Sequence, residues 1–275
     1  MDSQTSAPSF RLGFIGGGKL AGSVIRGLVR AKFCAPRAIL VSEPNETARR
    51  TLEDEAGVFV TAENAEVAGK SDIIFIGVKP AVVIPVLNDL ASKLERKLVV
   101  SLAAGVRTAS MEKVAAAHFM RAMTNTPSAI CRAATAVARG SRTTNAELSA
   151  VREIFEAIGV VVEISEDQID AVTALAGSGP AFVYTVIEAL ARGGEKTGLA
   201  PDAALVLATQ TVLGAAQLAA ETRLSPEELR KMVVTPGGTT AAGLAAMEQL
   251  KTSESLIAAV EAAAKRGAEI ARENQ

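Results

Sequence analysis

Short apolar segments and longer amphipathic segments alternate along the first part of the chain. Apolar, β-branched runs predict strands at 12–15, 39–42, 58–60, 73–78, 98–101, 119–123, 135–138 and 160–164. Helical periodicity between the early runs predicts helices such as 46–56 and 82–94. This alternation is typical of a largely parallel sheet covered on both faces, the doubly wound α/β class. The later strands can join such a sheet as antiparallel additions.

The pattern changes near Asp167, after which only helical periodicity is found. It predicts helices at 167–193, 201–221, 225–233, 240–249 and 253–273. Ser225 and Pro226, followed by two acids, make a strong helix start. We therefore predict an α/β domain over residues 1–166 and an all-helical domain over residues 167–275.

Two stretches of the predicted helical domain are almost without charge. Residues 203–220 carry no charged side chain and residues 171–191 carry only Glu188, so each approaches the length of a membrane span. Alanine dominates both, and no aromatic belt flanks either, which argues against a membrane span. Helices that are apolar all round are otherwise buried, and a domain of this size cannot bury that surface alone. We expect an obligate dimer formed through this half.

A glycine loop joins the first predicted strand to a helical pattern. Its Gly-x-Gly-x-x-Ala spacing, which begins at Gly16, fits the dinucleotide fingerprint. Glycines let the backbone approach a pyrophosphate, whose charge meets free N–H groups and the positive end of a helix dipole. An ordinary glycine-rich turn is the alternative. The residues expected to hold a cofactor here are Gly16, Gly17, Gly18, Lys19 and Leu20.

The second predicted strand ends at Ser42 and Glu43, where dinucleotide folds read the adenosine ribose. An acid at this place favours the free hydroxyls of NAD, whereas Ser42 with Arg49 or Arg50 would hold the extra phosphate of NADP. A third interpretation makes Glu43 a solvated loop charge. The expected cofactor is NADP(H) or NAD(H), with the preference open.

Further strand ends bring candidate residues to the edge where ligands bind in open α/β sheets. The fourth strand runs into Lys79 and Pro80, and the fifth into Ala104 and Gly105. The two small residues leave room for a flat nicotinamide ring, although they also suit a tight turn. The next strand leads to a polar cluster that can bind a ligand or cap a turn: Thr124, Asn125 and Thr126.

The loop VVTPGGTT, from Val233 to Thr240, is the most informative stretch of the second half. Its glycines expose backbone N–H groups, its threonines offer hydroxyls, and Thr240 can cap a helix that starts at Ala241. A substrate carboxylate could rest on these N–H groups and the helix dipole, leaving a hydroxyl for the reacting centre. A capped interhelical turn, the alternative, needs only one threonine.

Charge and cysteine content narrow the classes of function. The chain has 29 Lys and Arg residues and 30 Asp and Glu residues, so it lacks the excess of positive charge that is typical of proteins that bind nucleic acid or an anionic membrane. Cys34 and Cys131 are too few and too far apart for a disulfide framework or a metal site, which favours a cytoplasmic protein without a metal. The polar residues 1–9 are expected to form a frayed tail without a secretion signal.

The scarcity of bases points to the type of reaction. The only histidine, His118, lies at an apolar strand, where a structural or exposed role is expected. Oxidation of a hydroxy acid needs a general base. Reduction of a cyclic imine is less demanding, because the iminium arrives already protonated and the protein mainly positions the reactants.

Six motifs together resemble the pyrroline-5-carboxylate reductases, enzymes of the last step of proline synthesis. They are GFIGGGKLA at 13–21, VKP at 78–80, SLAAGV at 101–106, MTNTP at 123–127, DAVTALAGSGPAFVY at 170–184 and VTPGGTTAAGL at 234–244. The last two together are highly specific, and the resemblance extends from residue 12 to about residue 272.

The resemblance implies a Rossmann domain followed by a helical domain that interlocks with a second copy into a dimer, sometimes further assembled into a decamer. It implies reduction of a cyclic imino acid to proline by NAD(P)H. Residues implied at the cofactor are Asn64, Val78, Lys79, Pro80, Ala104, Gly105, Asn125 and Thr126. Residues implied at the substrate carboxylate are Thr235, Gly237, Gly238 and Thr239, with Thr240 as the catalytic contact to the ring nitrogen.

Two positions depart from the family's commonest pattern: Thr124 replaces a frequent proline, and Glu43 replaces a Ser or Thr near the 2′-phosphate of NADP. A β-hydroxyacid dehydrogenase has a similar plan, but its lysine after the glycine pair is missing, because residues 181–184 read AFVY. A redox sensor that binds a dinucleotide without turnover is the alternative outside enzymes.

Overall fold

The computed structural model describes residues 12–273, so the tail expected at residues 1–9 lies outside the described part. Backbone proximity divides the chain into two compact units. The α/β unit comprises Met1–Ser178 and Ala263–Gln275, and the helical unit comprises Gly179–Ala262. The predicted domain boundary after residue 166 stays a prediction.

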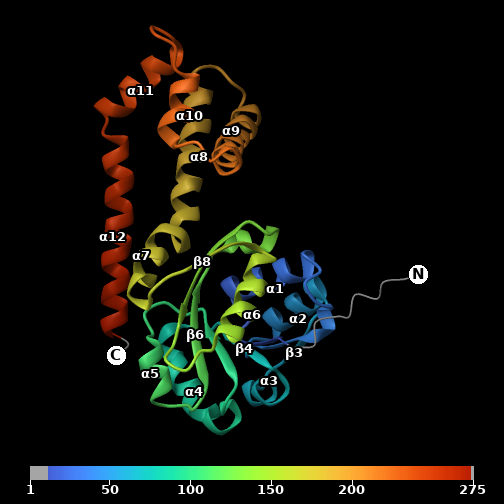
Figure 1. Ribbon diagram of the computed structural model, residues 1–275. Helices are drawn as coiled ribbons and strands as arrows, with labels where there is room; N and C mark the ends of the chain where they lie inside the picture. Colours follow the sequence, from blue (N-terminus) through green and yellow to red (C-terminus); the bar gives the residue numbers. More distant parts are fainter. Residues whose placement is uncertain (1–11, 274–275) are drawn as a thin grey trace, which may run out of the picture. The chain divides into compact units, whose positions relative to one another are not determined.

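Within the described residues, the α/β unit contains an eight-stranded sheet in the order β3-β2-β1-β4-β5-β6-β7-β8 (Figure 1). The strands are β1 (Leu12–Ile15), β2 (Ile39–Ser42), β3 (Phe59–Thr61), β4 (Ile73–Ile76), β5 (Leu98–Ser101), β6 (His118–Met123), β7 (Ala133–Arg139) and β8 (Gly159–Glu163). Strands β1 to β6 are parallel, β7 is antiparallel to β6, and β8 is parallel to β7. The predicted doubly wound sheet is confirmed, although β3 begins one residue later than predicted and β4 ends at Ile76.

Helices cover both faces of this sheet, which is why its central strands are apolar on both sides. One core holds Phe14 and Phe75, whose rings stack at 4.7 Å between centroids, together with apolar residues of α1 (Lys19–Arg30), α2 (Glu46–Ala56) and α6 (Asn145–Glu156). The other core holds apolar residues of α3 (Asn64–Lys70), α4 (Pro80–Leu94) and α5 (Thr108–Glu112). The two cores fix the strand ends that carry the candidate cofactor residues.

Helix α1 also packs tightly against a short 3-10 segment, Thr126–Ile130. A Cβ atom added at Gly27 would lie 2.1 Å from the carbonyl oxygen of Ser128. Only glycine permits this approach, because such a contact is far inside van der Waals distance. The packing thereby sets the position of Thr126 relative to the glycine loop at the start of α1.

The single helix predicted at 167–193 is wrong, because the chain changes its helical type there. It forms a 3-10 turn (Glu166–Gln168), α7 (Ile169–Val172), a π-helical turn (Thr173–Gly177) and then α8 (Gly179–Lys196). The N–H of Ser178 donates to the carbonyl of Thr173 five residues earlier, at 2.8 Å. Asn125 Nδ2 donates to the carbonyl of Ala176 at 3.1 Å, an oxygen without its usual helical donor because the residue four positions later, Pro180, has no N–H.

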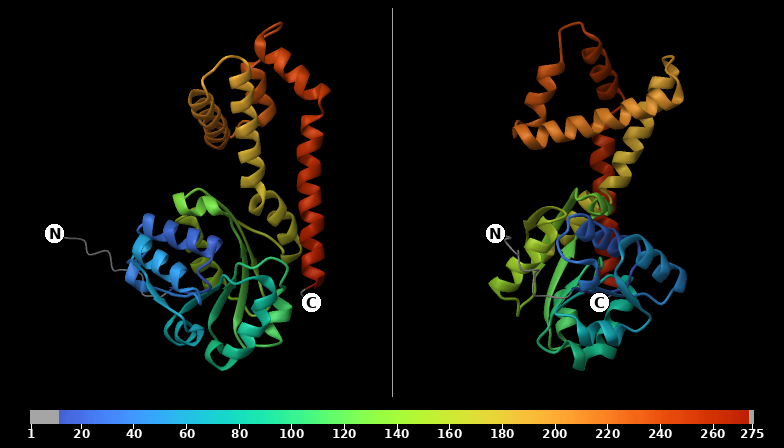
Figure 2. Two further views of the ribbon diagram at one scale, coloured as in Figure 1. Left: turned by 180° about the vertical axis from the view of Figure 1, so that it is seen from behind. Right: turned by 90° about the vertical axis from the view of Figure 1, so that its right-hand side faces the viewer.

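The helical unit contains α8, then α9 (Pro201–Thr222), α10 (Pro226–Val233), α11 (Thr239–Gln249) and the first part of α12 (Thr252–Glu273). Helix α9 crosses α8 (Figure 2), and their contact is built on small residues. The predicted start at Ser225 is confirmed, since Ser225 and Glu228 form a reciprocal capping box. The buried residues at the α8–α9 contact are Ala191, Ala204 and Ala208.

Most large apolar side chains of the helical unit are exposed in the single chain. On α9 they are Leu205, Val206, Leu207, Leu213 and Leu218. The segments Glu166–Lys196 and Pro201–Thr222 are long and apolar enough to cross a membrane by length and composition, which is weak support for a span on its own. A core of three alanines leaves this surface for another polypeptide to cover.

The approach of α1 to the 3-10 segment yields a stability test. Gly27→Ala should lower the free energy of unfolding by about 3 kcal/mol, because the new methyl group overlaps the Ser128 carbonyl. Gly69→Ala in α3 is the matched control, since its Cβ would meet no atom within 4 Å and should be neutral or stabilise by up to about 1 kcal/mol. Denaturant titration measures both, and equal midpoints for the two variants would contradict the packing.

Candidate active site

The glycine loop is shaped to expose the first turn of α1. Gly16 has φ +93°, and a Cβ there would lie 2.9 Å from the carbonyl carbon of Gly77, so a side chain is excluded by both conformation and space. Gly18 is the N-cap residue of α1 and no side chain caps the helix. The first N–H groups of α1 are therefore left to a ligand, at the positive end of the helix dipole.

A cavity of about 580 Å³ opens beside this loop, at the carboxyl ends of β4, β5 and β6. It lies wholly within the α/β unit. The structure therefore brings together predicted residues that are more than 100 positions apart in the chain. Those that line the cavity are Gly18, Lys19, Leu20, Val78, Lys79, Pro80, Ala104, Asn125 and Thr126.

Other predicted cofactor residues lie outside the cavity lining. Gly105 packs beneath it, where an added Cβ would lie 3.0 Å from the backbone nitrogen of Ala271. At the end of β2, the buried Ser42 hydroxyl donates to Asn64 Oδ1 at 2.7 Å. Gly17 donates its N–H to Glu43 Oε2 at 3.1 Å. The interpretation of Glu43 as a solvated loop charge is therefore wrong.

Sequence reasoning missed part of the cavity wall. The additional lining residues are Gly77, Leu102, Ala103, Met123, Thr173, Gly177 and Ser178, whereas Thr124, which also lines the cavity, belongs to the predicted polar cluster. Of these, Thr173, Gly177 and Ser178 belong to the quoted motif at 170–184, which was a signal without an assigned role. The hydroxyl of Thr124 shares a hydrogen bond of 2.8 Å with that of Thr135, so it serves the fold.

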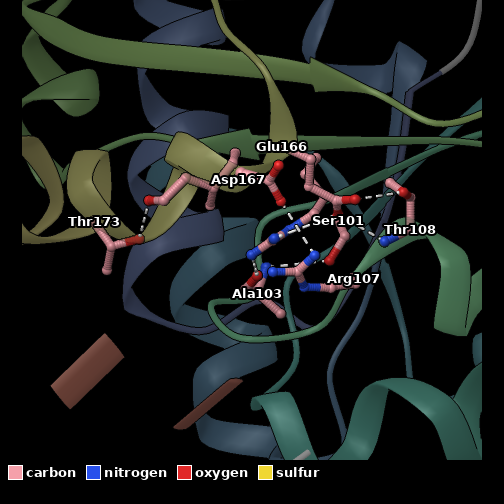
Figure 3. Close-up of polar contacts among 9 residues, drawn as sticks. Ser101, Ala103, Arg107, Thr108, Glu166, Asp167 and Thr173 are labelled. Atoms are coloured by element: carbon pink, nitrogen blue, oxygen red, sulfur yellow. Dashed lines mark hydrogen bonds and ion pairs between the residues drawn. The ribbon is translucent and has the colours of Figure 1, made fainter. Parts of the chain in front are cut away.

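A buried ion pair holds two walls of the cavity. Arg121, on β6, is 3% exposed and donates to Glu166 Oε1 and to the carbonyl of Ala103, both at 3.4 Å. Glu166 also accepts from the N–H of Thr108 at 2.7 Å and from its hydroxyl at 2.8 Å (Figure 3). Burial lowers the pKa of the Arg121 guanidinium, and the carboxylates of Glu166 and Asp170 oppose that effect. The pair ties the loop of Ala103 to the segment that leads into the π-helical turn.

The loop predicted to bind the substrate lies in the helical unit, between α10 and α11. Gly237 has φ +71° and the N–H of Gly238 donates to the carbonyl of Thr235 at 3.0 Å, which forms a tight turn. Helix α11 begins at Thr239 with Gly238 as its N-cap residue and no capping side chain. The predicted cap by Thr240 is wrong, because Thr240 is already inside the first turn. Its hydroxyl is consequently not used as a helix cap.

The single histidine lies at the amino end of β6, away from the strand ends that form the cavity. His118 Nδ1 contacts Glu147 Oε1 at 2.6 Å, which confirms a structural role. Burial acts to raise the pKa of Glu147, but hydrogen bonds from Thr144 and His118 outweigh it and lower that pKa. Within residues 12–273, no three His, Cys, Asp or Glu side chains form a group that could hold a metal.

Comparison with known proteins identifies the family. A family model for pyrroline-5-carboxylate reductase dimerisation matches residues 166–270, and one for NADP oxidoreductase, coenzyme F420-dependent, matches residues 11–105. The pyrroline-5-carboxylate reductase of Synechocystis sp. is 41% identical over 265 residues, which cover 96% of this chain and 99% of that protein. The chain belongs to the pyrroline-5-carboxylate reductase family. The Arabidopsis thaliana reductase is 40% identical over 268 residues, which cover 97% of each protein.

Solved structures of reductases in this family share the fold over their whole length. The Plasmodium falciparum pyrroline carboxylate reductase with NADP bound gives a TM-score of 0.88 at 28% identity, covering 97% of this chain and 100% of that one. The Coxiella burnetii reductase gives a TM-score of 0.87 at 35% identity, covering 95% and 98%. These matches confirm the predicted family and the predicted fold.

We expect loss of the Arg121–Glu166 ion pair to lower the free energy of unfolding much more than loss of an exposed ion pair. Arg121→Met should lower the free energy of unfolding of the α/β unit by about 3 kcal/mol, because it leaves the half-buried Glu166 without its cation. Arg107→Met breaks a solvent-exposed pair with Asp167 and should cost at most about 1 kcal/mol.

Denaturant unfolding of these variants and of the double variant Arg121→Met with Glu166→Leu measures the coupling. The double variant should lose less than the sum of the single losses, because no charge is left buried and unpaired. Additive losses would mean that the two side chains do not interact.

Proposed function

We propose that this chain is a pyrroline-5-carboxylate reductase, which reduces 1-pyrroline-5-carboxylate to L-proline with NAD(P)H in the last step of proline biosynthesis. Family membership at about 40% identity over nearly the whole chain is the observation that carries this proposal. An open helix N-terminus beside a cavity, and an uncapped glycine-threonine loop, support it. As an NAD(P)H-dependent oxidoreductase, the protein needs no metal for this reaction.

The residues at the glycine loop fit a dinucleotide. Gly18 has open space where a Cβ would be, and the first turn of α1 carries no acidic residue. The N–H groups of Lys19 and Leu20 would hold the pyrophosphate. Val78, Lys79, Pro80 and Ala104 would border the nicotinamide, with Asn125 and Thr126 beside it and Gly105 packing behind. When bound, the reduced nicotinamide supplies a hydride to the C=N carbon of the imine.

The substrate would be held by the loop of the helical unit. The N–H groups of Gly237 and Thr239, with the hydroxyl of Thr235, would bind its carboxylate at the positive end of α11, while the Gly238 N–H closes the turn on the carbonyl of Thr235. The Thr240 hydroxyl would hydrogen-bond the ring nitrogen. Since a protonated iminium needs no general base, these contacts serve mainly to orient the C=N carbon.

We propose a homodimer as the basic assembly, in the cytoplasm and not in a membrane. The exposed apolar side chains of α9 and its neighbours would be buried against a second copy. The dimerisation family model over residues 166–270 supports this assignment. Burial in the dimer would also explain why two helical segments are apolar enough to span a membrane, because helices in a protein core have the same apolar composition.

The direct test is oxidation of NADPH, and separately of NADH, by the purified chain with pyrroline-5-carboxylate, with proline identified as the product. Turnover with either cofactor supports the proposal. Cofactor binding without turnover would overturn it and favour a redox sensor. Parallel reactions without imine measure the background oxidation.

Thr240 is tested by Thr240→Ala, with Thr240→Ser as the control that keeps a hydroxyl. Loss of one hydrogen bond to the reacting group should lower kcat/KM by roughly 5- to 150-fold in Thr240→Ala. Thr240→Ser should retain most of the activity. Unchanged kcat/KM in Thr240→Ala would remove the assigned role, and circular dichroism checks that α11 is intact.

The assembly is tested by light scattering on protein purified without detergent. The chain mass is 28.3 kDa, and twice that value is expected for the dimer. Ten times that value would identify the decamer implied for some members of the family. A clean monomer mass would contradict the proposed burial of α9.

A further inference from the structure

The residues at the end of β2 decide whether a dinucleotide fold accepts an adenosine ribose with or without a 2′-phosphate. In this chain, the side chains near that strand end already make hydrogen bonds within the protein. Ser42, the residue suited to a 2′-phosphate, is fully buried. Its hydroxyl donates to Asn64 Oδ1 at 2.7 Å. The hydroxyl therefore holds the start of α3 and is not directed to a ligand.

The two arginines that could neutralise a 2′-phosphate already have partners within the chain, although the Arg50 side chain is 75% exposed. Arg49 Nη1 donates to the carbonyls of Glu43 and Pro44 at 2.6 and 2.9 Å. Arg50 forms an ion pair with Glu46 at 2.5 Å. The N-terminus of α2 is closed as well, since Asn45 Oδ1 accepts from the N–H of Ala48 at 2.9 Å.

Glu43 is fixed at this place by two backbone donors. Its Oε2 accepts from the N–H of Gly17 at 3.1 Å, and its Oε1 accepts from the N–H of Asn45 at 3.1 Å. The carboxylate therefore lies against the glycine loop that would hold the pyrophosphate. Each oxygen keeps a further lone pair, so the carboxylate can still accept hydrogen bonds from ribose hydroxyls.

We infer that Glu43 makes this chain selective for NAD(H) over NADP(H). Its carboxylate accepts hydrogen bonds from the free ribose hydroxyls of NAD(H) and repels the 2′-phosphate of NADP(H), and the buried Ser42 hydroxyl is not directed to that phosphate. The Plasmodium falciparum relative, by comparison, has been solved with NADP bound. The inference rests on the proposed function only for the kinetic part of its test.

The primary test is a fluorescence titration of the full chain with NADH and with NADPH, which needs no imine. Wild type should bind NADH at least about 10-fold more tightly than NADPH, because a hydrogen bond to a charged group is worth about one order of magnitude. In Glu43→Gln, NADPH binding should strengthen and the ratio of the two Kd values should fall by about 10-fold or more.

Glu53→Gln is the matched control. Glu53 lies near the far end of α2, is exposed, and gives the same change in net charge. Its Kd ratio should stay within about 2-fold of wild type, because a distant exposed charge is screened by salt. Equal or tighter binding of NADPH by wild type, or an unchanged ratio in Glu43→Gln, would overturn the inference. The wild-type ratio decides the question even if Glu43→Gln does not fold.

Turnover separates this inference from the proposed function. If the protein does not reduce pyrroline-5-carboxylate but the Kd ratio still depends on Glu43, the proposed function fails and the selectivity stands. If it turns over with equal kcat/KM for both cofactors in wild type and in Glu43→Gln, the selectivity fails and the function stands.

Discussion

The glycine loop depends on a contact between two residues without side chains, Gly16 and Gly77. A Cβ on Gly16 would lie 2.9 Å from the carbonyl carbon of Gly77, and a Cβ on Gly77 would lie 2.8 Å from the Cβ of Ala21. The ends of β1 and β4 and the first turn of α1 can meet only because these atoms are missing. This close approach leaves the first N–H groups of α1 uncovered at the sheet edge, beside the cavity.

The glycine loop between β1 and α1 has N–H groups with two different roles. The N–H of Gly17 donates to Glu43, while the first turn of α1 after Gly18 has no protein cap. In the proposed cofactor site, the adenosine end would thus be prearranged by a carboxylate, and the pyrophosphate would meet the uncapped N–H groups. Farther along the edge, Arg121 donates hydrogen bonds to Glu166 and to the carbonyl of Ala103. This ion pair therefore stabilises the loop of Ala103, which forms part of the cavity wall.

The helical unit, unlike the α/β unit, has only a small hydrophobic core of its own. Its own core is small and made largely of alanine, while the large apolar side chains of α9 remain exposed. Burial of those side chains requires another polypeptide, because a crossing of two alanine-lined helices excludes little water. The loop proposed to bind the substrate lies at the N-terminus of α11 in this unit, and its geometry is local: a turn at Gly237 and an uncapped helix start.

Local sequence patterns were sufficient to predict the strands, most of the helices and the residues of the binding motifs. All eight predicted strands are present, because short β-branched runs and intervening helical periodicity are properties of neighbouring residues. The residues at the ends of those strands, such as Lys79 and Asn125, could be assigned to one edge, because parallel strands end together. Ser225 was recognised from four consecutive residues, since a capping box is a local hydrogen-bond pattern.

What the sequence determined by itself was therefore the family, the succession of strands and helices along the chain and the position of the glycine loop. Only the tertiary structure decided the π-helical turn, which is accompanied by a hydrogen bond from Asn125, 51 positions from its acceptor Ala176. It also excluded one of the three interpretations of Glu43, the solvated loop charge, through a contact with Gly17 26 positions away. Hydrogen bonds across such separations leave no periodic or local trace, because they form only after the strands and helices have packed.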